Sequence, residues 1–102
     1  MHPLIERNHD AIAQLCRLHG VRSLAAFGSI LRSDFDTERS DVDVLVEFEP
    51  QVAGSFSNFL GLKEALEALF GRSVDLVERQ AIRNRRLRHY IEQSKAPLYA
   101  AT

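Results

Sequence analysis

Two aspartates separated by one residue are the side chains whose type and spacing best suit chemistry in this sequence. Asp41 and Asp43 would leave the same face of a β-strand, with their alpha carbons roughly 6.5 to 7 Å apart. Carboxylates so close repel each other. Mg²⁺ relieves this repulsion, because it binds one or two protein carboxylates and completes its shell with water and phosphate oxygens. An Asp-x-Asp pair taken alone is more often the solvated face of a strand, so its context has to decide.

A glycine-serine pair upstream of these aspartates suits phosphate binding. Gly28 follows the apolar run 21–27, and a glycine lets the backbone approach a phosphate closely. The Ser29 hydroxyl and the amides that follow can donate hydrogen bonds to the same group. Such a pair by itself is more often an ordinary turn. Its weight comes from its combination with the acidic residues.

A third aspartate lies in a later apolar run. Asp75 is the only acid between Val74 and Val77, and a carboxylate in an apolar interior needs a partner. If this run forms a strand beside the strand of Asp41 and Asp43, three carboxylates can hold two metal ions roughly 3.5 to 4 Å apart. Two such ions would stabilise the attacking and leaving oxygens of a phosphoryl or nucleotidyl transfer.

The strands that must position these residues follow from the hydrophobic pattern. Residues 21–27 are mostly apolar, which favours a strand buried on both faces. In 41–49 apolar and polar residues alternate, which predicts a strand with one core face and one polar face. The core face would carry Val42, Val44, Val46 and Phe48, and the polar face Asp41, Asp43, Leu45, Glu47 and Glu49.

Helices and connections are expected in the rest of the chain. Pro3 and Gly20 fit the first turn and the end of one helix, while Ser57 fits an N-cap and Gly71 the end of another. The expected elements are helices over 3–19, 58–70 and 81–93, a strand over 73–78, a helical turn at 29–33, a loop over 34–40 and a frayed tail over 96–102. The last helix is expected to turn Ile82, Leu87, Tyr90 and Ile91 toward the core.

Length and composition indicate one domain over 1–102, since 45% hydrophobic residues in a chain of 102 residues can form a core. The order of elements predicts an α/β or α+β fold, with a small mixed β-sheet flanked by helices. The single cysteine, Cys16, excludes a disulfide framework and a cysteine-rich zinc site, and it is expected in the core. No signal peptide or long apolar run is seen, which predicts a cytoplasmic protein without membrane contact.

Charge is distributed unevenly along the chain. Residues 34–49 contain seven acids and one base, whereas 79–95 contain six bases and one acid, so a cation-binding and an anion-binding region are both available. The formal net charge of −1 argues against direct, general nucleic-acid binding. The arginine-rich segment 83–88 leaves several interpretations open: RNA, an acidic protein surface, nucleotide phosphates, or a solvated helix face.

The combined motif resembles that of the minimal nucleotidyltransferase (MNT) domains of the DNA polymerase beta-like superfamily. The resemblance is carried by FGSILRSDFDTERSDVDVLVEFEP and the later GRSVDLVE, and it extends over nearly the whole chain. The sequence is most similar to MNT antitoxins that pair with HEPN-domain toxins. Eleven residues separate Ser29 from Asp41 where ten is usual, and Ser33 stands where many relatives have glycine or an acid. These departures affect the expected conformation of the loop, and hence the rate, more than the reaction class.

The resemblance implies roles for the motif residues. Arg32 flanks the acidic loop, where it could neutralise leaving pyrophosphate or equally be a solvated partner of the loop acids. Asp75 would be the third metal ligand and the base toward the acceptor hydroxyl. The implied site is Gly28, Ser29 and Arg32 for the nucleotide, and Asp41, Asp43 and Asp75 for two Mg²⁺ ions and catalysis.

The implied function is that of an antitoxin that modifies its toxin. It would transfer AMP from ATP to a tyrosine hydroxyl of a cognate HEPN RNase toxin and so silence it, and a homo-oligomer or a hetero-oligomer with the toxin is expected. Two alternatives stay open: an antitoxin that neutralises the toxin by binding alone, and a nucleotidyltransferase that acts on a small-molecule acceptor. The residues themselves, without the resemblance, indicate only nucleotidyl transfer to an unspecified acceptor.

Overall fold

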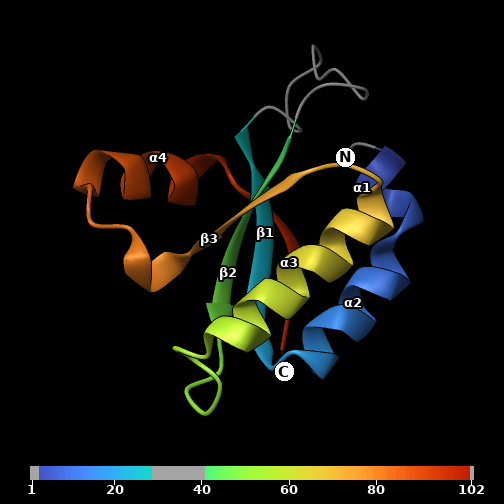
Figure 1. Ribbon diagram of the computed structural model, residues 1–102. Helices are drawn as coiled ribbons and strands as arrows, with labels where there is room; N and C mark the ends of the chain where they lie inside the picture. Colours follow the sequence, from blue (N-terminus) through green and yellow to red (C-terminus); the bar gives the residue numbers. More distant parts are fainter. Residues whose placement is uncertain (1–2, 29–40, 102) are drawn as a thin grey trace.

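The protein forms a mixed four-stranded β-sheet with helices on both faces (Figure 1). The computed structural model describes residues 3–28 and 41–101. The strand order is β3-β2-β1-β4, with β2 and β3 parallel and the other pairs antiparallel. The strands are β1 (Val21–Phe27), β2 (Val42–Phe48), β3 (Val74–Glu78) and β4 (Ala96–Ala100), and the helices are α1 (Pro3–Arg7), α2 (His9–Leu18), α3 (Phe56–Phe70), the 3₁₀ helix η2 (Arg79–Ala81) and α4 (Arg85–Ser94). The predicted fold class is confirmed.

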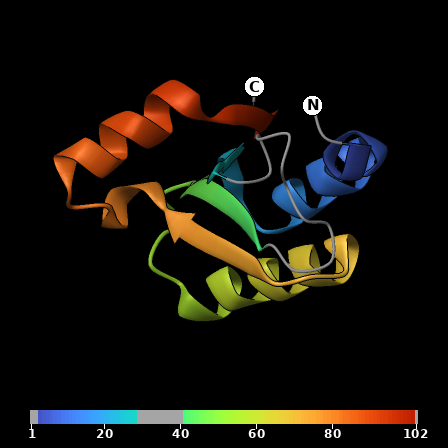
Figure 2. The ribbon, with the colours of Figure 1, turned by 90° about the horizontal axis from the view of Figure 1, so that it is seen from above.

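The main core lies between the sheet and the α2–α3 layer. The apolar residues of β2 at even positions are buried, as the alternation predicts, and they pack with Ile12 and Cys16 of α2 and Leu62 and Leu66 of α3. Seen from above, the sheet separates these two helices from α4 (Figure 2). Within the described residues, no helix has the length and apolar character needed to cross a bilayer.

The opposite face of the sheet has a smaller core, which the sequence did not predict. Leu45, expected on the polar face of β2, is buried together with Ile82 and Ile91. The alternation correctly placed Leu45 on the second face of β2, but α4 packs over this face and buries the side chain. β2 is therefore buried on both faces at its centre and keeps a polar second face toward its ends.

Helix boundaries differ from the predictions where polar side chains bind the backbone. The N-terminal helix is interrupted at Asn8, whose side chain donates a hydrogen bond to the carbonyl of Leu4 at 2.7 Å. α3 begins earlier than expected, because Ser55 rather than Ser57 is the N-cap and accepts a hydrogen bond from the Asn58 amide. The predicted end of α3 at Gly71 is confirmed, with a left-handed φ of 69°.

The C-terminal segment also differs from the prediction. α4 begins at Arg85 rather than near 81, since the Asn84 side chain caps it by accepting hydrogen bonds from two amides of the first turn. The tail expected to fray forms β4, which pairs with β1 and buries Leu98 in the main core. The predicted helical turn at 29–33 and loop at 34–40 lie outside the described residues.

Candidate functional site

Two of the predicted carboxylates lie on neighbouring strands at the same level. Asp43 of β2 and Asp75 of β3 are register partners in the parallel pair, so their side chains leave the same face of the sheet. The main-chain amide of Val42 donates a hydrogen bond to the carbonyl of Ser73 at 3.1 Å, which joins the starts of both strands. The expected adjacency of these strands is confirmed, and it pairs Asp43 with Asp75.

Gly28 lies against the Asp43 carboxylate from the other side. It directly follows β1, whose last residue, Phe27, is the register partner of Asp43. The φ of Gly28 is +73°, a conformation that favours glycine, and a Cβ added here would collide with Oδ2 of Asp43. The glycine is therefore required both by its backbone conformation and by the carboxylate beside it.

The exposure of the carboxylates suits a site that is open to large substrates. Asp41 and Asp75 are exposed and Asp43 is half-buried. The expectation that Asp75 sits in an apolar interior and needs a partner there is wrong, because its side chain is exposed while Val74 and Leu76 turn into the main core on the other face of the strand. Asp75 faces the opposite side, where bound water and phosphate oxygens can reach a carboxylate.

The donor set fits Mg²⁺, which prefers carboxylate oxygens together with water and phosphate. Within 3–28 and 41–101, however, no three His, Cys, Asp or Glu side chains are grouped closely enough to hold a metal ion. The three-carboxylate cluster thus stays a prediction. The structure shows one part of it, the register pairing of Asp43 with Asp75. Ser29 and Arg32 lie outside the described residues, so their assigned roles also stay predictions.

Glu67 positions the start of β3, a role that the sequence pattern did not reveal. Its carboxylate accepts hydrogen bonds from the Val74 amide at 3.0 Å and from Lys63 at 2.9 Å. The bond from Val74, followed by that from Lys63, lowers the pKa of Glu67 below its ordinary value. The i, i+4 pairing with Lys63 is visible in the sequence, whereas the contact with β3 depends on the packing of α3 against the sheet.

A network of ion pairs holds α4 over the second face of the sheet. Arg79 donates a hydrogen bond from Nε to Glu92 of α4 at 2.8 Å, and its Nη1 lies 3.8 Å from the Glu47 carboxylate of β2. Lys95 binds the other oxygen of Glu92 at 2.8 Å. These contacts join η2, β2 and α4, and so they set the position of α4 on the face that carries Asp43.

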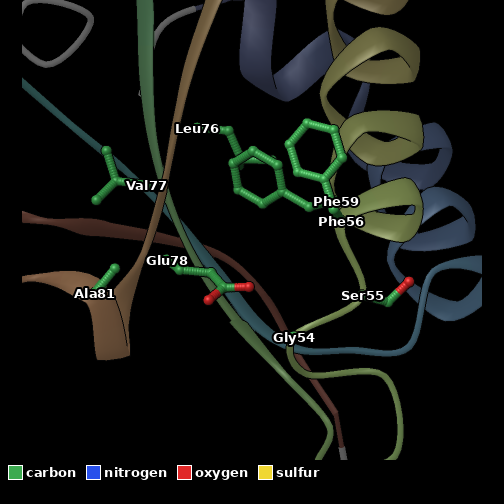
Figure 3. Close-up of a pocket in the computed structure, with 8 residues that line it drawn as sticks. All are labelled: Gly54, Ser55, Phe56, Phe59, Leu76, Val77, Glu78 and Ala81. Atoms are coloured by element: carbon green, nitrogen blue, oxygen red, sulfur yellow. The ribbon is translucent and has the colours of Figure 1, made fainter.

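An apolar cavity of about 420 Å³ lies at the other end of β3, away from the aspartates. In Figure 3 the rings of Phe56 and Phe59 point toward Leu76, and Glu78 lies beside them. The lining residues are Gly54, Ser55, Phe56, Phe59, Leu76, Val77, Glu78 and Ala81. None of the predicted site residues that the structure describes lines this cavity, so it is separate from the Asp43–Asp75 pair.

Comparison with known proteins agrees with this geometry. The sequence profile described as "Nucleotidyltransferase domain" matches residues 10–98. A candidate protein adenylyltransferase of Methanocaldococcus jannaschii is 42% identical over 89 residues, which are 87% of this chain and 86% of that protein. The protein adenylyltransferase MntA of Thermococcus cleftensis is 45% identical over 65 residues, which are 64% of this chain and 63% of that protein.

Solved structures show the same fold. A structure described as a candidate minimal nucleotidyltransferase has a TM-score of 0.77 and 33% identity, covering 95% of this chain and 96% of that one. A tri-AMPylated Shewanella oneidensis HEPN toxin in complex with an MNT antitoxin gives a TM-score of 0.68 at 18% identity, over 95% of this chain and 73% of the matched chain, a likeness of fold alone. From the profile match, the relatives and the paired aspartates, the chain belongs to the nucleotidyltransferase domain family.

Proposed function

We propose that this chain is the antitoxin of a HEPN/MNT pair and that it transfers AMP from ATP to a tyrosine hydroxyl of its HEPN toxin. The observation that carries the proposal is the register pairing of Asp43 with Asp75, with Gly28 against the Asp43 carboxylate. It brings together, from three separate segments, residue types that nucleotidyl transfer requires. The relatives named as protein adenylyltransferases support a protein as the acceptor.

In the proposed reaction the tyrosine oxygen attacks the α-phosphorus of ATP. A new phosphorus–oxygen bond forms to the tyrosine, the bond to the bridging oxygen breaks, and pyrophosphate leaves. Asp75 accepts the hydroxyl proton, which its position on the exposed face of β3 permits. The products are the AMP-tyrosine ester and pyrophosphate, so atoms and charge balance without any oxidant or reductant.

The remaining residues bind and orient the nucleotide. Asp41, Asp43 and Asp75 would hold two Mg²⁺ ions, which supply charge neutralisation at the phosphate oxygens. The backbone at Gly28 offers a close approach for the triphosphate. Ser29 and Arg32 are assigned to the triphosphate and the leaving pyrophosphate on their place in the motif.

The exposure of Asp75 supports a macromolecular acceptor. A small acceptor is usually enclosed by the enzyme that modifies it, whereas Asp75 and Asp41 are exposed on an open face. A side chain presented on the surface of another protein can reach such a site directly. A tyrosine hydroxyl on the toxin fits this geometry.

The test is an intact-mass measurement on the product of the neighbouring reading frame, which the proposal expects to be a HEPN-domain protein, after incubation with this chain, ATP and Mg²⁺. We expect the toxin to gain one or more AMP units and an Asp41→Asn, Asp43→Asn variant to add none. An unchanged toxin mass in a stable complex would contradict transfer and favour neutralisation by binding alone. AMP transfer from labelled ATP to small hydroxylated compounds, with none to the toxin, would favour a small-molecule acceptor.

A further inference from the structure

α4 presents a surface of arginines and apolar side chains that no contact within the described residues explains. We call it the α4 surface; it consists of Arg83, Arg85, Arg86, Leu87 and Tyr90. Leu87 and Tyr90 were expected to face the core but are 47% and 54% exposed. The helix is anchored through Ile91, which is 1% exposed. Its apolar residues are therefore divided between an anchor in the small core and an outward face.

The positive charge of this surface is not neutralised. Glu92 is the only acid between 79 and 95, and Arg79 and Lys95 already bind it. Among the described residues, the guanidinium groups of Arg83, Arg85 and Arg86 have no hydrogen bond or ion pair. These exposed charges are therefore available to an anionic partner.

The arginines are also poorly placed for the stability of α4. Arg85 and Arg86 lie in its first turn, which contains no acid, at the helix end where the macrodipole is positive and cations are unfavourable. Features that oppose local stability are expected where they serve function. Arginine and tyrosine are also the residues most enriched among the dominant contacts of protein interfaces.

The position of the α4 surface relates it to the candidate site. α4 packs through Ile91 on Leu45 of β2, which follows Asp43 by two residues and leaves the same face of the sheet. Figures 1 and 2 show α4 as a separate layer on this side, with its N-terminal end reaching past the sheet. A macromolecule bound to α4 thus lies on the face from which Asp43 and Asp75 are accessible.

We infer that the α4 surface docks the acceptor protein, through an acidic and partly apolar surface of the HEPN toxin. The inference rests on the proposed function for the identity of the partner. The arginines supply charge complementarity, and Leu87 and Tyr90 supply an apolar centre that a free nucleotide would not fill. Docking here would hold the toxin against the face that carries the aspartates.

RNA fits the same surface less well. Asp43 leaves the sheet face on which α4 packs, and without bound Mg²⁺ its carboxylate would repel a phosphate backbone that extends from the arginines across the sheet. A folded protein can instead present acids to the arginines and apolar residues to Leu87. RNA is therefore kept as an outcome of the test.

The test compares two variants that each lose one adjacent arginine–leucine pair. Arg86→Ser with Leu87→Ser removes the centre of the α4 surface. Arg17→Ser with Leu18→Ser removes an exposed pair of the same two residue types from α2, on the other side of the sheet, where Leu18 is 77% exposed. Calorimetry measures the Kd of each variant for the product of the neighbouring reading frame, which the proposed function expects to be the HEPN toxin. We expect the α4 variant to bind at least about tenfold more weakly and the α2 variant to bind within about twofold of the unmodified chain.

Further measurements separate the possible outcomes. Equal toxin affinity of the α4 variant and the unmodified chain overturns the inference. Loss of ATP binding by the α4 variant also overturns the inference and assigns α4 to the nucleotide. If the unmodified chain binds an RNA oligonucleotide through α4 while toxin binding is unchanged in the variant, the inference is overturned in favour of RNA. If the unmodified chain binds the toxin through α4 but adds no AMP, the docking inference stands and the proposed transferase function fails.

Discussion

Asp43 is the residue on which the candidate site depends, because it lies between Gly28 at the end of β1 and Asp75 on β3. Its carboxylate lies against Gly28 on one side. On the other side, the register of β2 with β3 places the Asp75 side chain directly beside it. The sequence indicated that Asp75 could join the other aspartates if the two strands were neighbours, and the register of the parallel pair sets it opposite Asp43. The contact with Gly28 could not be predicted, since it depends on how β1 pairs with β2.

Substitution of the glycine tests this arrangement. Gly28→Ala is expected to slow AMP transfer about a hundredfold, because displacement of a catalytic group by about 1 Å has that effect. Its positive φ adds a stability loss of roughly 1 to 2 kcal/mol. Gly54→Ala is the matched control, since Gly54 has a φ of +88° and nothing within 4 Å of an added Cβ. The two variants are compared by rates of AMP incorporation and by thermal unfolding; equal rates in both would contradict the role of the contact.

At the scale of elements, the strands were more predictable than the helix ends. The alternation of apolar and polar residues identifies β2, and the mostly apolar run 21–27 identifies β1. The starts of α3 and α4 depend on which of several polar residues caps the helix. Ser55 and Asn84 do so with extended backbone dihedrals of their own, which the sequence pattern does not reveal. β4 was not predicted, because Pro97 and short apolar residues give no strand pattern. The periodicity of α4 cannot show which apolar residues the sheet covers.

The anchoring of α4 can be tested within the helix itself. Ile91→Ala is expected to lower the free energy of unfolding by about 2 to 4 kcal/mol, because it leaves a cavity beside Leu45 and Ile82. Leu87→Ala on the same helix is expected to change it by about 0.5 kcal/mol or less, since that side chain is half exposed. Urea unfolding measures both. Equal losses for the two variants would show that α4 packs through a different face.

For the whole molecule, acidic side chains with lowered pKa values link its layers. Glu67 joins α3 to β3, where its hydrogen bond from the Val74 amide lowers its pKa most. Glu92 joins α4 to η2, and hydrogen bonds from Lys95 and then Arg79 lower its pKa. Because both pKa values are lower in the folded chain than in the unfolded chain, these contacts stabilise the fold above the ordinary glutamate pKa of 4.5. This stabilisation is lost as the pH falls through the folded-state values.

Acid unfolding should therefore depend on these two residues. We expect the unfolding temperature to fall more between about pH 6 and about pH 3 for the unmodified chain than for a Glu67→Gln, Glu92→Gln variant. Glu64→Gln, on the exposed side of α3, serves as the control and should keep the full pH dependence. Scanning calorimetry at several pH values makes the comparison. An identical pH dependence in all three proteins would contradict the linkage.

The place of β4 in the sheet has a consequence for how the chain folds during synthesis. β1 is a central strand, and one of its two neighbours, β4, is translated after the other elements of the described residues. Until 96–100 emerge, one edge of β1 has no strand partner, and an open edge of this kind invites pairing with other chains. The long separation between β1 and β4 also makes their pairing a late and entropically costly step. The nascent chain thus keeps one edge of a central strand open to other chains until β4 is released.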